Sequence, residues 1–282
     1  MLLTYCVTVC GNLLIILVVS YSRSLHSPMY FFLTQLSFLD ILLTTTIVPN
    51  MLRVVLYEGC SVTFISCLAQ FYCFLAIESI ECLLLTVMSY DRYQAICNPL
   101  HYRLVVNFTF CVKTIFLSWG FVVFVTLMMY LTMTHLLFCG PNVIDHFFCD
   151  FDPILELSCS DTFVVKMESK LIAVPLVICP FMVIIISYIY IIATILKMPS
   201  VTGRQKTFST CSSHLLVVSL YYGSLISIYL FPNMINAKKL LSLFYNVVTP
   251  LLNPIIYSLR NKDINQALEK IMKEMQKGTL LL

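Results

Sequence analysis

Long apolar runs separated by short polar segments dominate the chain. Each run has about twenty residues or more, which is the length that an α-helix needs to cross about 30 Å of hydrocarbon. The runs do not show the ten-residue alternation that marks the strands of a membrane barrel. We therefore predict seven membrane-spanning helices, at approximately 2–20, 29–52, 64–90, 108–133, 165–196, 206–230 and 240–259.

The composition excludes a soluble protein. Sixty per cent of the 282 residues are apolar and only 11% are charged, whereas soluble domains carry roughly a quarter charged residues. The net charge of +3 is too small to indicate a nucleic-acid partner. The predicted fold class is an all-α integral membrane protein, a seven-helix bundle with a short amphipathic helix after the seventh span.

The two ends of the chain fit this plan. The first run lacks a basic segment before it and is too long for a signal-peptide core, so we interpret it as a retained span. We divide the chain into a seven-helix domain (1–260) and a cytoplasmic amphipathic helix with a tail (261–282). The apolar face of that helix carries Ile264, Ala267, Leu268, Ile271, Met272 and Met275, and its polar face carries Glu269, Lys270, Lys273 and Glu274.

The distribution of basic residues predicts the orientation in the plasma membrane. With the N-terminus outside and the C-terminus in the cytoplasm, twelve of the seventeen Lys and Arg residues lie on the cytoplasmic side. This bias follows the positive-inside rule. The basic residues left outside are Arg53, Lys166, Lys170, Lys238 and Lys239.

The thirteen cysteines divide by their predicted location. Seven lie within apolar spans, where a small buried hydrophobe is the ordinary interpretation, and Cys97 is cytoplasmic. Five lie on the oxidising outer side, where disulfides persist. An odd number leaves one unpaired, and spacing alone does not assign the pairs. These five are Cys60, Cys67, Cys139, Cys149 and Cys159.

Three ionisable side chains lie inside predicted spans, namely Asp40 in the second and Glu78 and Glu81 in the third. Charged groups in a bilayer are costly and indicate function by default. The alternative for each is a neutral, hydrogen-bonded carboxylic acid. A cation path through a channel or transporter would also use such a set.

Five motifs together resemble the odorant receptors, a family of rhodopsin-like G-protein-coupled receptors. The resemblance covers nearly the whole chain, from Gly11 to Asn261. The motifs are residues 88–102 with Asp91-Arg92-Tyr93, residues 250–261 with Asn253-Pro254 and Tyr257, residues 25–32, the pair Ser187-Tyr188, and residues 206–214.

The resemblance implies a conformational switch on the cytoplasmic side. Asp91 would hold the Arg92 guanidinium until a G protein competes for it; the alternative is an interfacial arginine that reaches the headgroups. Without the family, Tyr188 and Tyr257 would equally suit an aromatic belt. The implied coupling residues are Asp91, Arg92, Tyr93, Tyr188, Lys206, His214, Asn253, Pro254 and Tyr257.

The resemblance also implies a buried polar cluster of Asn12, Asp40, Glu81 and Asn253, which holds a sodium ion or a proton in the resting state. It implies disulfides Cys67–Cys149 and Cys139–Cys159, which leave Cys60 unpaired.

A small-molecule odorant would bind in the outer half of the bundle. Glu78 lies near the floor of that pocket and would favour a cationic or hydrogen-bond-donating ligand; the alternative is that it braces the sixth span. The implied lining, which is also consistent with core packing, is Phe74, Leu75, Glu78, Ser169, Ile172, Leu176, Tyr222, Leu225, Ile226 and Tyr229.

The expected function is ligand-induced activation of a stimulatory, olfactory-type G protein that raises cyclic AMP. The alternatives are a class A receptor for an amine or small metabolite and, less favoured, a cation channel or transporter. An enzyme is not predicted, since no nucleophile–base pair is evident. One departure stands out: the sequence has no extracellular tail with a glycosylation site, so we expect it to be incomplete at its N-terminus.

Overall fold

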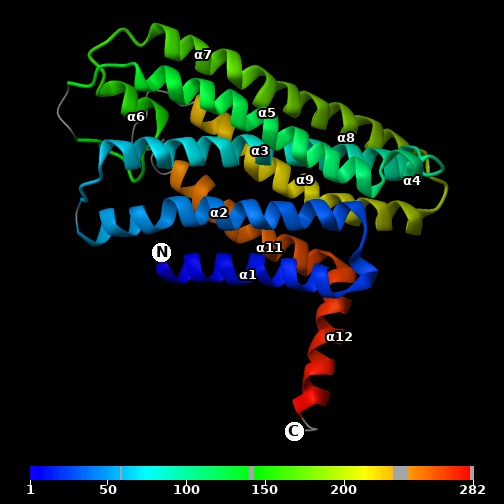
Figure 1. Cartoon of the computed structure of the whole chain (residues 1–282). Coiled ribbons are helices and arrows are strands. Elements are labelled where there is room, and N and C mark those ends of the chain that lie inside the picture. Colours follow the sequence, from blue (N-terminus) through cyan, green and yellow to red (C-terminus); the bar gives the residue numbers. More distant parts are fainter. Residues whose placement is uncertain (58, 140–142, 231–240, 280–282) are drawn as a thin grey trace.

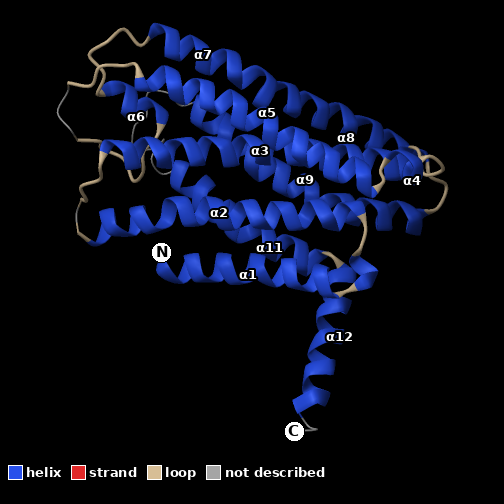
Figure 2. Cartoon of the chain, viewed as in Figure 1, coloured by secondary structure: helices blue, strands red, loops and turns tan. Residues whose placement is uncertain are grey.

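The computed structural model describes the whole chain apart from residues 58, 140–142, 231–240 and 280–282. Helices lie side by side along one common direction, and the loops gather at the two ends of the bundle (Figure 1 and Figure 2). The described residues contain no β-strand beyond an isolated antiparallel bridge between Phe138 and Ser158. The predicted all-α fold class is confirmed.

Five helical stretches of the described residues are long and apolar enough to cross a membrane. The fifth stretch is helical throughout, but it contains a π-helical turn near its middle. The stretches are α1 (Leu2–Tyr21), α2 (Pro28–Leu56), α3 (Phe64–Cys97), α5 (Phe108–Thr134) and Phe163–Lys197, which is made of α7 (Phe163–Ala173), η2 (Val174–Ile178) and α8 (Cys179–Lys197).

Two more stretches take the places of the sixth and seventh predicted spans. α9 (Val201–Leu230) packs against α3, α8 and α11 (Thr249–Arg260). α11 continues the π-helical turn η3 (Phe244–Val248) and also packs against α1 and α2. α9 begins at Val201, five residues before the predicted sixth span. Residues 202–205 are polar or glycine, so they lie outside the apolar run from which the span was predicted.

Local chemistry explains where several helices begin and end. The side chain of Thr63 accepts a hydrogen bond from the Ser66 N–H at the start of α3, and Asn107 accepts one from Phe110 at the start of α5. α3 continues seven residues past the predicted apolar run and ends at Cys97, just before Asn98-Pro99. Hydropathy marks the part of a helix that lies in lipid, whereas proline marks the end of the helix itself.

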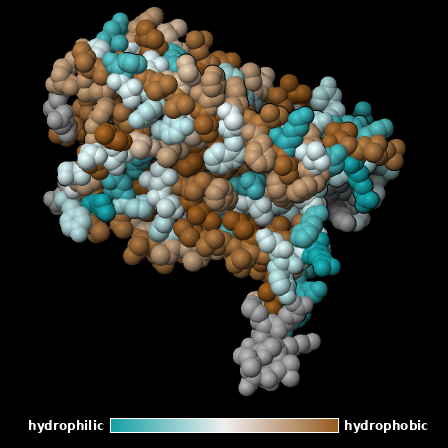
Figure 3. Space-filling model, in the orientation of Figure 1, coloured by the Kyte–Doolittle hydropathy of each residue, from teal (hydrophilic) through white to brown (hydrophobic). Residues whose placement is uncertain are grey.

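α3 forms the axis of the bundle, because it packs against α2, α5, α8 and α9. Its buried apolar side chains, among them Ile80, Leu84 and Leu85, belong to one continuous core. Figure 3 shows apolar side chains over the middle of the bundle and polar ones toward its ends, as expected for a surface that faces lipid between two aqueous layers. The predicted site residues Glu78, Glu81 and Asp91 therefore lie on the central helix.

α12 (Lys262–Thr279) leaves the bundle crosswise after α11 (Figure 1). The Asn261 side chain caps its start by accepting from the Asp263 N–H at 3.0 Å. The Tyr30 hydroxyl of α2 donates to Asp263 at 2.9 Å. Ile264 and Ala267 are buried, whereas Lys270 and Lys273 are exposed. The remaining short helices are η1 (Arg23–Leu25), α4 (Tyr102–Val105) and α6 (Phe151–Glu156).

Candidate functional site

An ion pair lies near the C-terminal end of α3, which the sequence analysis places on the cytoplasmic side. Arg92 Nη2 and Asp91 Oδ2 are 3.0 Å apart, and the exposed fractions of the two side chains are 12% and 1%. A pair this well shielded from water is held much more firmly than a surface salt bridge. The guanidinium is thereby kept in place on its own helix.

Tyr102, in the short helix α4 that follows α3, completes this arrangement. Its hydroxyl donates to Asp91 Oδ1 at 2.7 Å, whereas Asp91 Oδ2 takes part in the ion pair with Arg92 and accepts no hydrogen bond among the described residues. Burial and the negative charge of Asp91 raise the pKa of the Tyr102 hydroxyl well above its ordinary value, which keeps it protonated and donating at neutral pH. Tyr102 is the last residue of the motif at 88–102, and the sequence alone predicts no role for it. Only the folded loop shows that it returns to Asp91.

We expect Tyr102→Phe to raise the ligand-independent activity of the protein. The change removes only a hydrogen bond to a carboxylate, which contributes roughly 1.5–3 kcal/mol. If half or less of this energy stabilises the closed state relative to the open one, its loss raises basal signalling about three- to tenfold. Cyclic AMP measured in cells without added ligand checks this. Tyr57→Phe, at an exposed tyrosine just after α2, serves as the control; equal basal signals from the two variants would contradict the assignment.

A second polar contact joins α8 to α9. The Tyr188 hydroxyl and His214 Nδ1 are 2.7 Å apart, and both side chains are buried. Their rings also stack, with centroids 5.8 Å apart. Tyr93 packs edge to face on Tyr190 of α8. Tyr188 and His214, two of the predicted coupling residues, are therefore in direct contact. Lys206, another of them, has a side chain outside the described residues.

Tyr257 of α11 is fully buried, and its hydroxyl has no hydrogen-bond partner among the described residues. Asn253 lies on the same helix, one turn toward its N-terminus, and contacts Asp40 of α2. Asn253 Nδ2 donates to both carboxylate oxygens of Asp40, at 3.0 and 3.1 Å. The structure thus brings together two members of the predicted polar cluster.

Asn12 belongs to the same region, and Pro254 explains its contact. A proline in a helix removes the hydrogen bond to the carbonyl four residues earlier, which here is that of Pro250. Asn12 Nδ2 donates to this Pro250 carbonyl at 3.2 Å and to the Thr8 carbonyl at 3.1 Å. A neighbouring helix thereby satisfies the freed backbone group, as is usual in membranes.

Among the described residues, several oxygen atoms of this cluster have no hydrogen-bond partner. They are Asn12 Oδ1, Glu81 Oε1 and Asn253 Oδ1, all buried. Carboxylate and amide oxygens are the donors that hard cations take. The described residues contain no group of three or more His, Cys, Asp or Glu side chains arranged for a metal ion. The unpartnered atoms are all oxygens, so this donor set fits a hard cation such as sodium, or a proton.

Glu78 lies above this cluster and is buried. The Tyr221 hydroxyl of α9 lies 2.9 Å from the Glu78 carbonyl, 3.1 Å from its Oε2 and 3.0 Å from Cys82 Sγ. Glu78 Oε1 has no hydrogen-bond partner among the described residues. One carboxylate oxygen thus braces the sixth span, and the other remains available.

The predicted ligand-lining residues occupy different environments. Leu176 and Tyr222 are buried, and the ring of Tyr222 packs on Phe181 with centroids 4.7 Å apart. Ile226 is 42% exposed, and the side chain of Tyr229 lies outside the described residues. Glu78 is buried, as described above, and the remaining five are half-buried. Of these, Phe74, Ile172 and Leu225 contact the main core, and Leu75 and Ile172 contact a second apolar cluster. Ser169 lies on α7.

The long loop between α5 and α7 covers this region with Phe148, a residue for which the sequence alone predicts no role. Phe148 is buried and packs edge to face on Phe74, with centroids 5.2 Å apart. His146 packs on Phe148 in turn. The Cys149 N–H donates to Gln70 Oε1 at 3.1 Å, which fixes the loop on α3. The sequence feature that indicates this contact is the pair Phe147-Phe148 directly before Cys149.

Two disulfides hold the outer end. Cys67 of α3 joins Cys149 with a Cα–Cα distance of 5.5 Å, and Cys139 joins Cys159 at 5.9 Å. These are the pairs that the family resemblance implied. Cys60 is free and exposed, and its Sγ lies 3.5 Å from Asn50 Oδ1.

The all-helical bundle and the buried Asp91–Arg92 pair at one end fit a seven-helix, non-enzymatic receptor of the G-protein-coupled class, and the family match shows this class. The chain belongs to the olfactory receptor family, whose model, described as "Olfactory receptor", matches residues 1–275. Human "Olfactory receptor 11L1" is 45% identical over 275 residues, which cover 96% of this chain and 85% of that protein. Rat "Olfactory receptor 1468" is 44% identical (95% and 86%), and mouse "Olfactory receptor 1M1" is 45% identical (95% and 87%).

Proposed function

We propose that this receptor binds a small volatile or amphipathic molecule in the outer half of the bundle and activates a stimulatory, olfactory-type G protein, which raises cyclic AMP. The N-terminus would lie outside the plasma membrane and the C-terminus in the cytoplasm. The observation that carries the proposal is the buried Asp91–Arg92 pair with its Tyr102 clasp. In this pair Arg92 is a cation that Asp91 keeps in place at the proposed cytoplasmic end of α3.

The switch would work through a difference in affinity. A ligand that binds more tightly when the inner end of α9 has moved outward shifts the population toward that state. The Tyr188–His214 contact spans α8 and α9, so it would have to rearrange in this movement. Arg92, Tyr188 and Tyr257 would then line an opening for a helix of the G protein, with residues 206–214 at its edge.

The buried cluster around Asp40 would stabilise the resting state. Asp40 is bound to Asn253 of α11, and Glu81 on α3 offers a free oxygen. A sodium ion or a proton there would reduce the repulsion between the two carboxylates. The sodium ion or proton would be lost when α11 shifts, because Asn253, which contacts Asp40, lies on that helix.

Glu78 favours a narrower class of ligand within this proposal. Its free Oε1 is a buried acceptor on the central helix, two residues from Ile80 of the core. A carboxylate with one unused oxygen suits a ligand that carries an amine or another strong hydrogen-bond donor. This observation also supports the second candidate, a receptor for an amine or small metabolite outside olfaction.

We expect Glu78→Gln to weaken responses to primary amines by about tenfold or more, because a hydrogen bond to a charged group contributes about 1.5–3 kcal/mol. Responses to alcohols, aldehydes and esters should persist, since glutamine keeps the size of the side chain and the acceptor for Tyr221. The measurement is a cyclic AMP dose–response for each compound class. Glu156→Gln, at an exposed carboxylate of the outer loop, is the matched control.

The general test is a cyclic AMP screen against a chemically diverse panel, with an N-terminal tail added to aid export. A saturable response to some member, lost in Arg92→Ala at equal surface expression, is expected. If no compound raises cyclic AMP although the protein reaches the surface and couples when basal activity is measured, the ligand class is wrong. If basal coupling is also absent, the G-protein assignment fails.

A further inference from the structure

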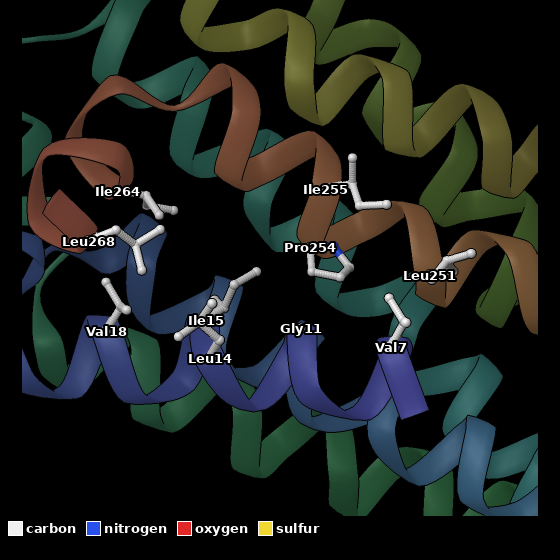
Figure 4. Close-up of a pocket in the computed structure, with 10 residues that line it drawn as sticks. All are labelled: Val7, Gly11, Leu14, Ile15, Val18, Leu251, Pro254, Ile255, Ile264 and Leu268. Atoms are coloured by element: carbon white, nitrogen blue, oxygen red, sulfur yellow. The ribbon is translucent and has the colours of Figure 1, made fainter. Parts of the chain in front are cut away.

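A groove of 110 Å³ lies between α1, α11 and α12, and Pro254 is the only predicted site residue that lines it. Figure 4 shows side chains from all three helices turned toward it, including Leu14 and Val18 of α1, Pro254 of α11, and Ile264 and Leu268 of α12. Every residue that lines it is apolar or glycine. None of the predicted ligand-lining residues contributes to it.

The shape of the groove follows from how α1 meets α11. Gly11 lets the two helices approach closely, because a Cβ atom at this position would lie only 3.2 Å from Pro254 Cγ. Below this close contact α12 turns away from the bundle axis and crosses the inner end of α1. The space between the close contact and α12 is the groove.

The groove opens toward lipid. Leu14 is 48% exposed although it lines the groove, and its neighbours Leu13 and Leu17 on α1 are also exposed apolar side chains. α1 is one of the stretches long and apolar enough to span a membrane. The groove is therefore continuous with a surface that contacts hydrocarbon, and water would gain no hydrogen bond inside it.

Its length matches one leaflet. From Val7 to Val18 the helix rises about 16 Å at 1.5 Å per residue, roughly half of the 30 Å hydrocarbon core. Its inner end is closed by the amphipathic helix α12, whose exposed Lys270 and Lys273 lie on the polar face. A volume of 110 Å³ is well below the roughly 300–1,000 Å³ of pockets for drug-sized molecules. It suits part of one flexible chain better than a rigid sterol.

The source of that chain is a membrane phospholipid, because the apolar groove is exposed along α1 and lies beside the exposed lysines of α12. The phosphate of that lipid would lie at the headgroup level, where Lys270 and Lys273 are the nearby cations on a polar face that also carries Glu269.

We propose that this groove binds one acyl chain of a phospholipid from the cytoplasmic leaflet, with its headgroup beside α12. The bound chain contacts Pro254, which is adjacent to the Asn253 that holds Asp40. It thereby supports the packing of α1 on α11 and links the lipid to the helix that carries the polar cluster.

The full chain, reconstituted in phosphatidylcholine nanodiscs that contain phosphatidylserine with a photoreactive diazirine in one acyl chain, tests this. After illumination, mass spectrometry locates the adducts. We expect them to concentrate on α1 around Leu14 and Ile15 and on α12 around Ile264 and Leu268. Leu14→Trp, which fills the mouth of the groove, should lower the α12 adducts several-fold.

Leu17→Trp is the matched control, because Leu17 is exposed on the same helix but does not line the groove. It should leave the adducts unchanged. Leu268→Phe, which fills the groove from the other side, guards against a folding defect in one variant, and thermal unfolding midpoints equal to the unsubstituted protein confirm integrity. Adducts spread evenly around α1, adducts insensitive to both filling variants, or displacement by cholesterol but not by unlabelled phospholipid would each overturn the proposal.

Discussion

Asp91→Asn is expected to raise ligand-independent cyclic AMP production by tenfold or more, up to the ceiling set by full activation. Removal of one partner of a shielded ion pair costs about 3–5 kcal/mol, because the other charge is left uncompensated. Here that cost falls on the closed state alone, since Arg92 would leave Asp91 on opening. A difference of about 1.4 kcal/mol already changes the population ratio tenfold.

The control for this prediction removes a carboxylate on the same side of the membrane. Glu269→Gln lies on the exposed face of α12 and should leave basal signalling unchanged. Surface expression of both variants must be measured, so that signalling is compared for equal numbers of receptors. An Asp91→Asn variant with wild-type basal activity would show that the pair does not hold the closed state.

Cys67→Ser should cause the largest loss of stability of any single change at the outer end. The Cys67–Cys149 bridge closes a loop of 82 residues. In the chain-entropy treatment a loop of this size corresponds to about 4.5 kcal/mol, whereas the Cys139–Cys159 loop, with a separation of 20, corresponds to about 3 kcal/mol. Because the spans remain in the membrane when the bundle loosens, these values are upper bounds.

The expected result for Cys67→Ser is a markedly lower unfolding midpoint in detergent and little receptor at the cell surface. Cys139→Ser should show a smaller decrease. Cys60→Ser provides the control, since Cys60 is a free, exposed cysteine on the same outer side. A Cys67→Ser protein as stable as Cys60→Ser would mean that this bridge contributes little to the fold.

The helices were predictable because membrane insertion imposes a local requirement. A run such as 108–133 has to be apolar over its whole length, and α5 occupies Phe108–Thr134. Helix ends were less predictable where the helix leaves lipid, as in α3, which continues to Cys97 through residues of mixed polarity.

The site was predictable only in part, because several of its contacts join residues that are distant in the chain. The pairing of Asp91 with Arg92 involves neighbours and was expected. The approach of Tyr102 to Asp91 depends on the loop turning back, and the burial of Phe148 against Phe74 depends on where the Cys67–Cys149 bridge fixes the outer loop. The groove beside Gly11 forms where three helices meet. The hydrophobic pattern of a sequence predicts individual helices but not how they cross.

Guanine-nucleotide exchange by a purified stimulatory G protein tests the central claim most directly, because it needs no ligand. The wild-type protein, Asp91→Asn and Arg92→Ala would be reconstituted in nanodiscs at equal concentration, and the rate of nucleotide exchange measured for each. The account predicts that Asp91→Asn exceeds wild type and that Arg92→Ala falls to the rate of the G protein alone. An Arg92→Ala protein that catalyses exchange as fast as wild type would contradict it.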